Sequence, residues 1–320
     1  MSLVLDVRRL RLLRDFALLG TVAATAQAQH LTGPAVSQQL AALEKAAGVP
    51  LLRKRGRILE LTAAGRRMVE HADVILSGLA AAEADLAALR AGGRGTVRIV
   101  AFPSAARVLL PPLWQRLASD LEHRIDLRIS EAEPGRALAR LRGDADLAIV
   151  HAYSLLPRQL PPGCEEHRLL TDPVYFAISR KLAAEHGLVA GQAVELDQFA
   201  DTDWLLPAPE TSCHELTQRA CGAAGFVPRS VVLASDFAVL TALVAAGAGV
   251  ALVPGMALPS AGQPGLELFP LRRPVTRTVS AVVPSGNSQH IHLRRVLDQL
   301  AEVCADIGQQ AAASGLSTKM

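Results

Sequence analysis

The sequence lacks the features that would mark a membrane, secreted or zinc-binding protein. None of its apolar runs reaches the ~18 residues that a membrane span needs, because Arg, Glu or Pro interrupts each one. The first residues alternate cations with leucines and do not read as a secretory signal. The four cysteines show no C-x-x-C spacing, which disfavours a zinc site or a disulfide framework. These absences predict a cytoplasmic protein that does not bind membranes.

Signatures of catalysis and of nucleotide binding are missing as well. The sequence contains no H-E-x-x-H, G-x-S-x-G or G-x-x-x-x-G-K-[ST] motif. Gly247 and Gly249 do not make a dinucleotide fingerprint, because a helix is expected before them and a strand after them, the reverse of the required order. We therefore expect no enzyme activity, no metal and no cofactor. A metabolic enzyme of two α/β lobes and a solute-binding protein remain as alternatives.

The chain does have an uneven distribution of charge. Residues 1–66 carry ten Lys and Arg against four Asp and Glu, whereas the remainder carries 23 against 26. A basic N-terminal unit on a mildly acidic body indicates that a polyanion, if one binds, meets the N-terminus. The alternative is a solvated basic face that arose by chance.

The N-terminal segment reads as short helices followed by a hairpin. Helices are expected over Val7–Leu19 and Thr21–His30, and Thr32 is a good N-cap for a third helix that Gly48 ends. Steps of 100° place two sets of residues on opposite faces of this third helix. The apolar set is Val36, Leu40, Leu43 and Ala47, and the small or amide set is Pro34, Ser37, Gln38 and Ala41. A hairpin with a turn at Gly56 is expected over Leu51–Leu61.

One long helix is expected from Ala63 to Arg90, capped by Thr62 and stopped by Gly92 and Gly93. Its apolar residues follow a 3-4 spacing typical of a coiled-coil seam. They are Ala72, Ile75, Leu79, Ala82, Leu86 and Leu89. The seam predicts a dimer, and the alternative is that it packs against its own domain.

Strands and helices alternate from Thr96 onward, which predicts parallel α/β architecture in two lobes joined by crossover strands. The strands expected are Thr96–Phe102, Ile125–Glu131, Asp146–Val150, Val174–Ser179, Trp204–Leu206, Ser230–Leu233, Val250–Val253 and Thr278–Val283. The helices expected are Ala105–Ser119, Pro134–Arg142, Cys213–Ala223, Asp236–Ala246 and Ser288–Cys304. The small, polar tail from Gln309 is expected to fray.

Two serines at expected helix starts suggest a binding site between the lobes. Ser104 follows the first strand and Ser212 opens a later helix. Helix N-termini favour anions, so two of them at one cleft would hold a small carboxylate. The alternative is that both serines only cap their helices. Cys213 and Cys221 lie about 12 Å apart along a helix, too far for a disulfide, and read as ordinary semi-buried cysteines.

The sequence resembles the LysR-type transcriptional regulators over about residues 6–304. The resemblance is carried by GTVAATAQAQHLTGPAVSQQLAALEKAAGVPLLRKRGRILELTAAG, GTVRIVAFPSAARVLLPPL, LRGDADLAIV and LTALVAAGAGVALVP. It implies a winged helix-turn-helix over residues 1–62, a dimerisation linker helix over 63–92 and an effector-binding domain over 93–304. The last has a two-lobed α/β fold like that of type 2 periplasmic binding proteins. Lobe I would span about 93–171 and 274–304, lobe II about 172–273, and 305–320 a flexible tail.

The resemblance also implies partners and site residues. Homodimers or tetramers would bind promoter DNA, with RNA polymerase as a possible further partner, and a small effector, an anionic metabolite, would bind between the lobes. The residues implied at DNA are Thr32, Gly33, Pro34, Ser37, Gln38, Arg53, Lys54, Arg55 and Arg57. Those implied at the effector are Ser104, Ala105, Glu131, Thr211 and Ser212.

Three departures from the family pattern bear on this expectation. Gly33 and Gln38 stand where many members have Gln and Arg, which removes an arginine that reads guanine. Gln29 stands where a core leucine is common. The operator sequence therefore does not carry over from the family.

Overall fold

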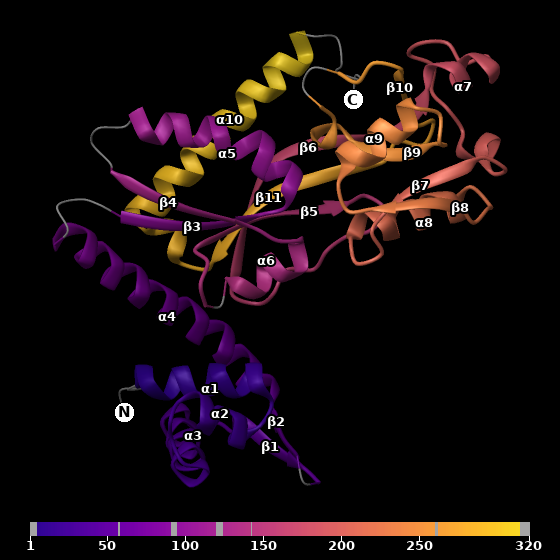
Figure 1. Cartoon of the computed structure of the whole chain (residues 1–320). Helices are drawn as coiled ribbons and strands as arrows, with labels where there is room; N and C mark the ends of the chain where they lie inside the picture. Colours follow the sequence, from indigo (N-terminus) through magenta and orange to yellow (C-terminus); the bar gives the residue numbers. More distant parts are fainter. Residues whose placement is uncertain are drawn as a thin grey trace.

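The computed structural model describes residues 5–56, 58–90, 95–119, 124–141, 143–259 and 262–313. A small N-terminal domain is followed by one long helix, which rises to a larger two-lobed body (Figure 1). In the part of the chain that is described, no helix is long and apolar enough to cross a membrane.

The N-terminal domain packs helices around a small apolar core. Its elements are α1 (Val7–Leu19), α2 (Val22–Ala28), α3 (Gly33–Ala47), β1 (Leu52–Arg55) and β2 (Ile58–Leu61). The core takes Leu13 and Phe16 from α1, and Leu40 and Leu43 from α3, all buried. The predicted helices and hairpin are confirmed, and Gly56 turns the hairpin with φ +64°. Arg57 lies outside the described residues.

Gln29, which stands where a core leucine is expected, has a polar partner in the N-terminal domain. The Gln29 side-chain amide donates to Oδ2 of Asp15 at 2.5 Å, and Asp15 on α1 is buried. Arg14 donates to the other carboxylate oxygen. A leucine at position 29 would leave this carboxylate oxygen without its donor, so Gln29 and Asp15 belong together.

The long helix α4 (Ala63–Arg90) has the predicted bounds. The Thr62 hydroxyl accepts the N–H of Gly65 at 3.0 Å, which is the predicted cap. Ala72 is buried in the core of the N-terminal domain, whereas Ile75, Leu79 and Leu86 are exposed by 39%, 38% and 56%. The start of the apolar seam thus packs against its own domain and these later positions do not. The side chain of Leu89 is outside the described part.

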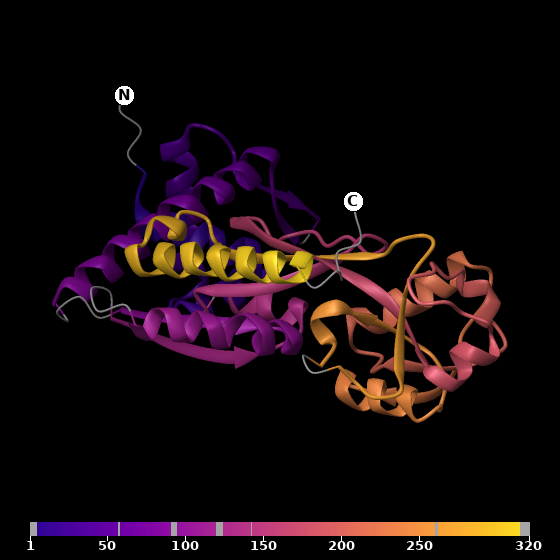
Figure 2. The same cartoon turned by 90° about the horizontal axis from the view of Figure 1, so that it is seen from above.

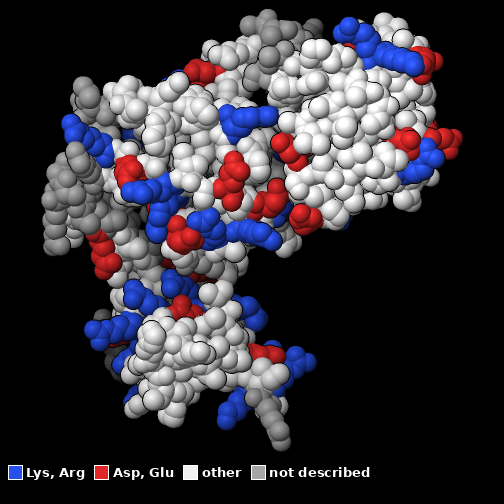
Figure 3. Space-filling view, viewed as in Figure 1, with Lys and Arg blue, Asp and Glu red and all other residues white. Residues whose placement is uncertain are grey.

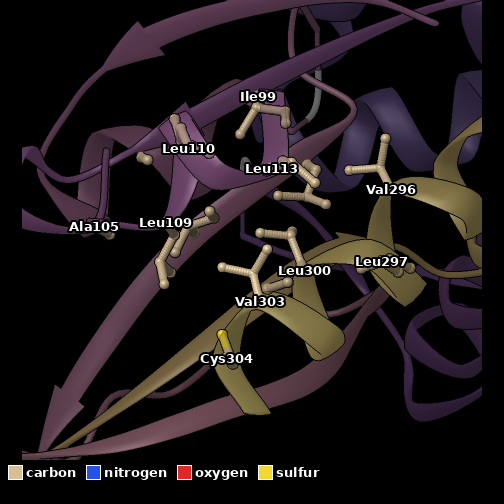
Figure 4. Close-up of a cluster of buried hydrophobic side chains, with 14 of the residues drawn as sticks. Ile99, Ala105, Leu109, Leu110, Leu113, Val296, Leu297, Leu300, Val303 and Cys304 are labelled. Carbon is tan, nitrogen blue, oxygen red and sulfur yellow. The ribbon is translucent and has the colours of Figure 1, made fainter. Parts of the chain in front are cut away.

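Lobe I is a sheet covered by helices on both sides. Its strands β3 (Gly95–Ala101), β4 (Ile125–Glu131) and β5 (Leu147–Tyr153) are parallel, and β11 (Thr276–Pro284) is antiparallel to β5. Alternate strand residues face opposite sides, with Ile99 under α5 (Pro103–Ser119) and α10 (Ile291–Ala313), and Val100 under α6 (Pro134–Arg140). Figure 4 shows α5 and α10 meeting through their apolar side chains.

Lobe II surrounds a core of large aromatic side chains that includes Phe176, Phe199 and Trp204. Its strands β7 and β8 pair in parallel, and β7 is joined to the residue before β9 by a bridge between Trp204 and Val250. Strands β9 and β10 both pair with β6 (Cys164–Ser179). The elements are α7 (Arg180–Glu185), η1 (Leu196–Phe199), β7 (Asp203–Pro207), α8 (Ser212–Ala223), β8 (Arg229–Ala234), α9 (Phe237–Ala245), β9 (Ala251–Pro254), η2 (Gly255–Ala257) and β10 (Leu266–Pro270). Seen from above, the two lobes lie side by side (Figure 2).

Two adjacent chain segments join the lobes, as predicted. Strand β6 (Cys164–Ser179) pairs with β11 over residues 164–173 and with β9 and β10 beyond them. The return crossing lies beside it, because the N–H of Val174 donates to the carbonyl of Val275 at 2.9 Å. The hinge between the lobes is therefore a two-stranded antiparallel ribbon.

Three expectations for the body were wrong. The sheet is mixed, because β6, β9, β10 and β11 pair antiparallel. The expected strand at Val174–Ser179 is only the second half of β6, and β10 and α7 were missed. Helix α10 continues to Ala313, so residues 305–313 do not form a flexible tail, and Ile307 extends its apolar stripe onto the lobe I core. Residues 314–320 lie outside the described part.

Candidate DNA interface and inter-lobe polar cluster

Helix α3 exposes the polar face that the sequence predicts. Its Val36, Leu40 and Leu43 are buried, while Thr32, Pro34, Ser37 and Gln38 are exposed and Gly33 is half-buried. The Thr32 hydroxyl caps the helix by accepting the N–H of Ala35 at 3.4 Å. Ser37 and Gln38 thus project from a fixed helix as donors and acceptors of the kind that read base edges in a major groove.

The cations of β1 form a second exposed group in the same domain. The side chains of Arg53 and Arg55 are 61% and 78% exposed, and Lys54 is also exposed. Glu60 on β2 lies 3.5 Å from Arg53 and 3.8 Å from Arg55, but ion pairs between such exposed groups are weak. Lys and Arg side chains surround much of this lower domain on the face shown in Figure 3. The cations remain available to phosphates.

Glu44, which no motif in the sequence marks, joins the hairpin to α3. One carboxylate oxygen of Glu44, Oε1, accepts the N–H groups of Leu51 and Leu52 at 2.8 and 2.9 Å. Both N–H groups belong to the start of the hairpin. Glu44 therefore fixes where β1 leaves α3, and with it the spacing between Gln38 and the cations.

Between the lobes, Arg277 on β11 is the centre of a buried polar group. Its guanidinium donates twice to Oδ2 of Asp172, with the shorter distance 2.6 Å, and once to the Ser104 hydroxyl at 3.2 Å. It also lies 4.9 Å above the ring of Phe102. Burial acts to lower the pKa of Arg277, but Tyr153 and Asp172 outweigh it and raise the pKa. The predicted Ser104 is thus bonded to a charge-compensated arginine.

The second predicted serine reaches across from lobe II. Ser212 begins α8, and its Oγ lies 2.8 Å from Nε2 of His151 in the second half of β5. Burial lowers the pKa of His151 well below its usual range, and Arg277 and Arg158 lower it further, so the ring is neutral at pH 7. The predicted Thr211 caps α8 by accepting the N–H of His214 at 3.3 Å. Lobe II thereby contacts lobe I through Ser212.

Two further members complete what we call the inter-lobe polar cluster. Glu133 precedes α6, and the charges of Arg158 and Arg277 both act to lower its pKa, against the burial that raises it. The guanidinium of Arg158 donates to the carbonyl of His151 at 3.0 Å. The cluster consists of Ser104, Glu133, His151, Arg158, Ser212 and Arg277. Two signals in the sequence could have identified new members: Arg277 is a charged residue directly before the strand expected over Thr278–Val283, and His151 directly follows the strand expected over Asp146–Val150.

Two of the predicted effector residues stand apart from this cluster. The side chain of Ala105 is fully buried in the core of lobe I (Figure 4), so its predicted role rests on its backbone N–H in the first turn of α5. Glu131 ends β4 and is exposed. The roles of both remain predictions.

The cysteines of α8 are buried thiols. Burial raises the pKa of Cys213 to about 11 and that of Cys221 to about 12. Cys213 Sγ lies 2.9 Å from the Tyr153 hydroxyl. Since thiol reactivity requires the thiolate, this environment disfavours redox chemistry at neutral pH.

Comparison with known proteins places both parts of the chain. The family model described as bacterial regulatory helix-turn-helix protein, lysR family, matches residues 7–66, and that described as LysR substrate binding domain matches residues 90–305. The HTH-type transcriptional regulator IlvR of Caulobacter vibrioides is 30% identical over 78% of this chain and 82% of its own length. The HTH-type transcriptional regulator AlsR of Bacillus subtilis is 28% identical over 71% of this chain and 73% of its own length.

A solved structure resembles the whole molecule. The C206 mutant of Corynebacterium glutamicum OxyR superposes with a TM-score of 0.59 at 26% identity, and the match covers 98% of this chain and 96% of that one. The similarity thus extends over the N-terminal domain, the long helix and both lobes.

Proposed function

Because the chain belongs to the LysR family of transcriptional regulators, and is thus a DNA-binding regulator with an effector-binding domain, we propose how its parts divide that work. Helix α3 enters the major groove, where Ser37 and Gln38 contact base edges. Arg53, Lys54 and Arg55, together with Arg57, bind the phosphates alongside. The observation that carries this assignment is that one domain exposes both the polar face of α3 and the cations of β1.

The charge distribution supports this division of roles. Gln38 carries an amide, which pairs bidentately with adenine, and carries no charge. The cations of β1 can exchange their weak contacts with Glu60 for phosphates and release counterions from the DNA. Sequence preference should therefore come mainly from α3, and the dependence of affinity on salt mainly from β1.

Members of the family act on DNA as oligomers, and we assign the contact between protomers to α4. The exposed Ile75, Leu79 and Leu86 form an apolar line that a second copy of the helix would cover. Two such dimers would make a tetramer. The regulator would act in the cytoplasm, and contact with RNA polymerase would follow from its place at a promoter.

We place the effector between the two lobes, at the inter-lobe polar cluster. Ser104 lies on lobe I, Ser212 on lobe II, and the Arg277–Asp172 pair lies on the ribbon between them. A ligand held by both lobes would fix their relative orientation, and α4 would transmit this orientation to the DNA-binding domains. No step of this role requires catalysis by the chain.

The deciding experiment is fluorescence anisotropy with the duplex upstream of this protein's own gene, measured across a salt series and against scrambled DNA. We expect tight, salt-sensitive binding that prefers the upstream duplex. Arg180→Ala, which removes an exposed cation of lobe II, should bind like the wild type. Failure to bind either duplex at low salt would refute the proposal and favour the alternatives, an enzyme or a solute-binding protein.

A further inference from the structure

The carboxylate of Glu133 has no role in the fold that the structure reveals. Glu133 occupies the N-cap position of α6, where an acidic side chain normally accepts a free N–H of the first turn, yet it makes no such bond. Its Oε2 is buried and has no hydrogen-bond partner among the residues that the structure describes. Buried polar atoms without a partner are rare in folded proteins. Glu133 therefore has an unused acceptor at the cluster.

The charges around Glu133 do not satisfy this acceptor. Burial raises the pKa of Glu133, Arg158 and Arg277 lower it, and Glu210 raises it again. Neither arginine forms an ion pair within 4.0 Å of Glu133 in the described part of the chain. Arg277 is compensated by Asp172. A positively charged donor from outside the chain would supply the missing partner.

Three other members of the cluster, His151, Ser212 and Arg158, present groups that suit a carboxylate. His151 is 2% exposed, and its Nδ1 has no hydrogen-bond partner among the described residues. When Nε2 accepts the hydroxyl proton of Ser212, Nδ1 carries the other proton and becomes a donor. Ser212 also begins the twelve-residue α8, whose N-terminus favours negative charge, and Arg158 adds a cation.

We propose that the inter-lobe polar cluster binds a small zwitterion, an α-amino acid or a metabolite like one, with its ammonium group at Glu133 and its carboxylate at His151, Ser212 and Arg158. The inference rests on the proposed function and specifies the chemical class of its effector. A simple anion would leave Glu133 unpaired and bring a like charge towards it. A simple cation would lie close to two arginines.

Isothermal titration calorimetry on the full chain tests the charge requirement without any substitution. The probes are the common L-amino acids, their 2-oxo acids, which lack the ammonium group, and their methyl esters, which lack the carboxylate. We expect at least one amino acid to bind, and its oxo acid and its ester each to bind at least tenfold more weakly. An oxo acid or an ester that binds as tightly as the amino acid would overturn the inference.

Two variants then locate the two ends of the ligand. Glu133→Gln should weaken amino-acid binding at least tenfold. It should also reduce the difference in affinity between the amino acid and its oxo acid. Arg158→Ala should weaken binding of both. Glu185→Gln, on the exposed face of α7, is the matched control and should change neither. If Glu133→Gln retains wild-type affinity and selectivity, the ammonium site is assigned to the wrong residue.

DNA binding, measured on the same preparations, separates this inference from the function on which it rests. If the upstream duplex binds and no probe does, the inference fails and the regulator stands. If an amino acid binds with the expected selectivity and no duplex does, the ligand class stands and the DNA-binding proposal fails.

Discussion

At the scale of single residues, the α3 face and the β1 cations differ in what a substitution should change. Gln38→Ala should reduce the preference for the upstream duplex over scrambled DNA, at a cost of about 1–3 kcal/mol, because a bidentate base contact is lost. The slope of log affinity against log salt should barely change. Anisotropy titrations at several salt concentrations give both quantities.

Arg55→Ala should change the salt slope and leave the preference for the upstream duplex largely unchanged. Loss of one phosphate contact weakens binding to every sequence and flattens the salt slope by about one unit. The same titrations measure it, with Lys181→Ala on lobe II as the control cation. If this variant and Gln38→Ala behave alike, the division between base contacts and phosphate contacts is wrong.

Ionisation of Glu133 should also affect how the stability of the native state depends on pH. An acid whose pKa is raised by folding destabilises the native state as pH rises above its unfolded value, here about 4.5. Glu133→Gln should therefore unfold at a higher temperature than the wild type at pH 7, and the difference in unfolding temperature should vanish below pH 4. Thermal unfolding followed by circular dichroism across pH 3.5–8 measures this. A stabilisation independent of pH would point to packing instead of charge.

At the scale of elements, the sequence predicted those whose signal is local. The N-terminal helices, the hairpin and α4 follow from caps and periodic apolar residues within one segment. Strand β6 was half missed, because Asp172-Pro173 in its middle reads as a turn, and its pairing with β11 joins residues about a hundred positions apart. The same holds for the site: Ser104 and Ser212 were found as helix starts. The local signals at Arg277 and His151 do not show their partners, Asp172 and Ser212, which are distant in sequence.

Helix α4 offers a test of the oligomer. Leu79→Asp and Leu86→Asp place charges on the proposed contact between protomers, while both positions are exposed within one chain. The double variant should shift the mass measured by light scattering towards the monomer and leave the helical circular dichroism largely intact. A matched pair on another face of the same helix, Glu70→Lys with Arg67→Glu, should keep the oligomer. If the double variant keeps its wild-type mass, α4 is not the contact.

Glu44 joins α3 to the β1–β2 hairpin, so its loss should affect both stability and DNA binding. Glu44→Ala leaves two N–H groups at the start of the hairpin without their acceptor, at a cost of about 1–3 kcal/mol. We expect a lower unfolding temperature and weaker DNA binding even at temperatures where the domain is folded. Chemical denaturation followed by circular dichroism, together with anisotropy, separates the two effects. Unchanged affinity in the folded variant would show that the hairpin holds its position without Glu44.

At the scale of the whole molecule, the lobes are joined by a ribbon whose two strands are clamped by one buried ion pair. Asp172 on β6 holds Arg277 on β11, and its other oxygen accepts the N–H of Met256 in lobe II at 3.0 Å. Asp172→Asn would leave a buried guanidinium without compensation, at a cost of about 3–5 kcal/mol. Thermal unfolding should show the loss in the two-lobed body. An unchanged unfolding temperature would mean that Arg277 finds another partner.

The same ribbon makes lobe II a continuous insertion within the sequence of lobe I. The chain leaves lobe I near residue 173 and re-enters it near residue 276, and these two positions are neighbours, as Thr276 pairs with Pro173. Lobe II is, in this sense, a cassette inserted into a loop of lobe I, with its entry and exit one strand spacing apart. If the effector binds as proposed, a change confined to lobe II alters that lobe's part of the effector site while lobe I, α4 and the DNA-binding domain keep their sequences.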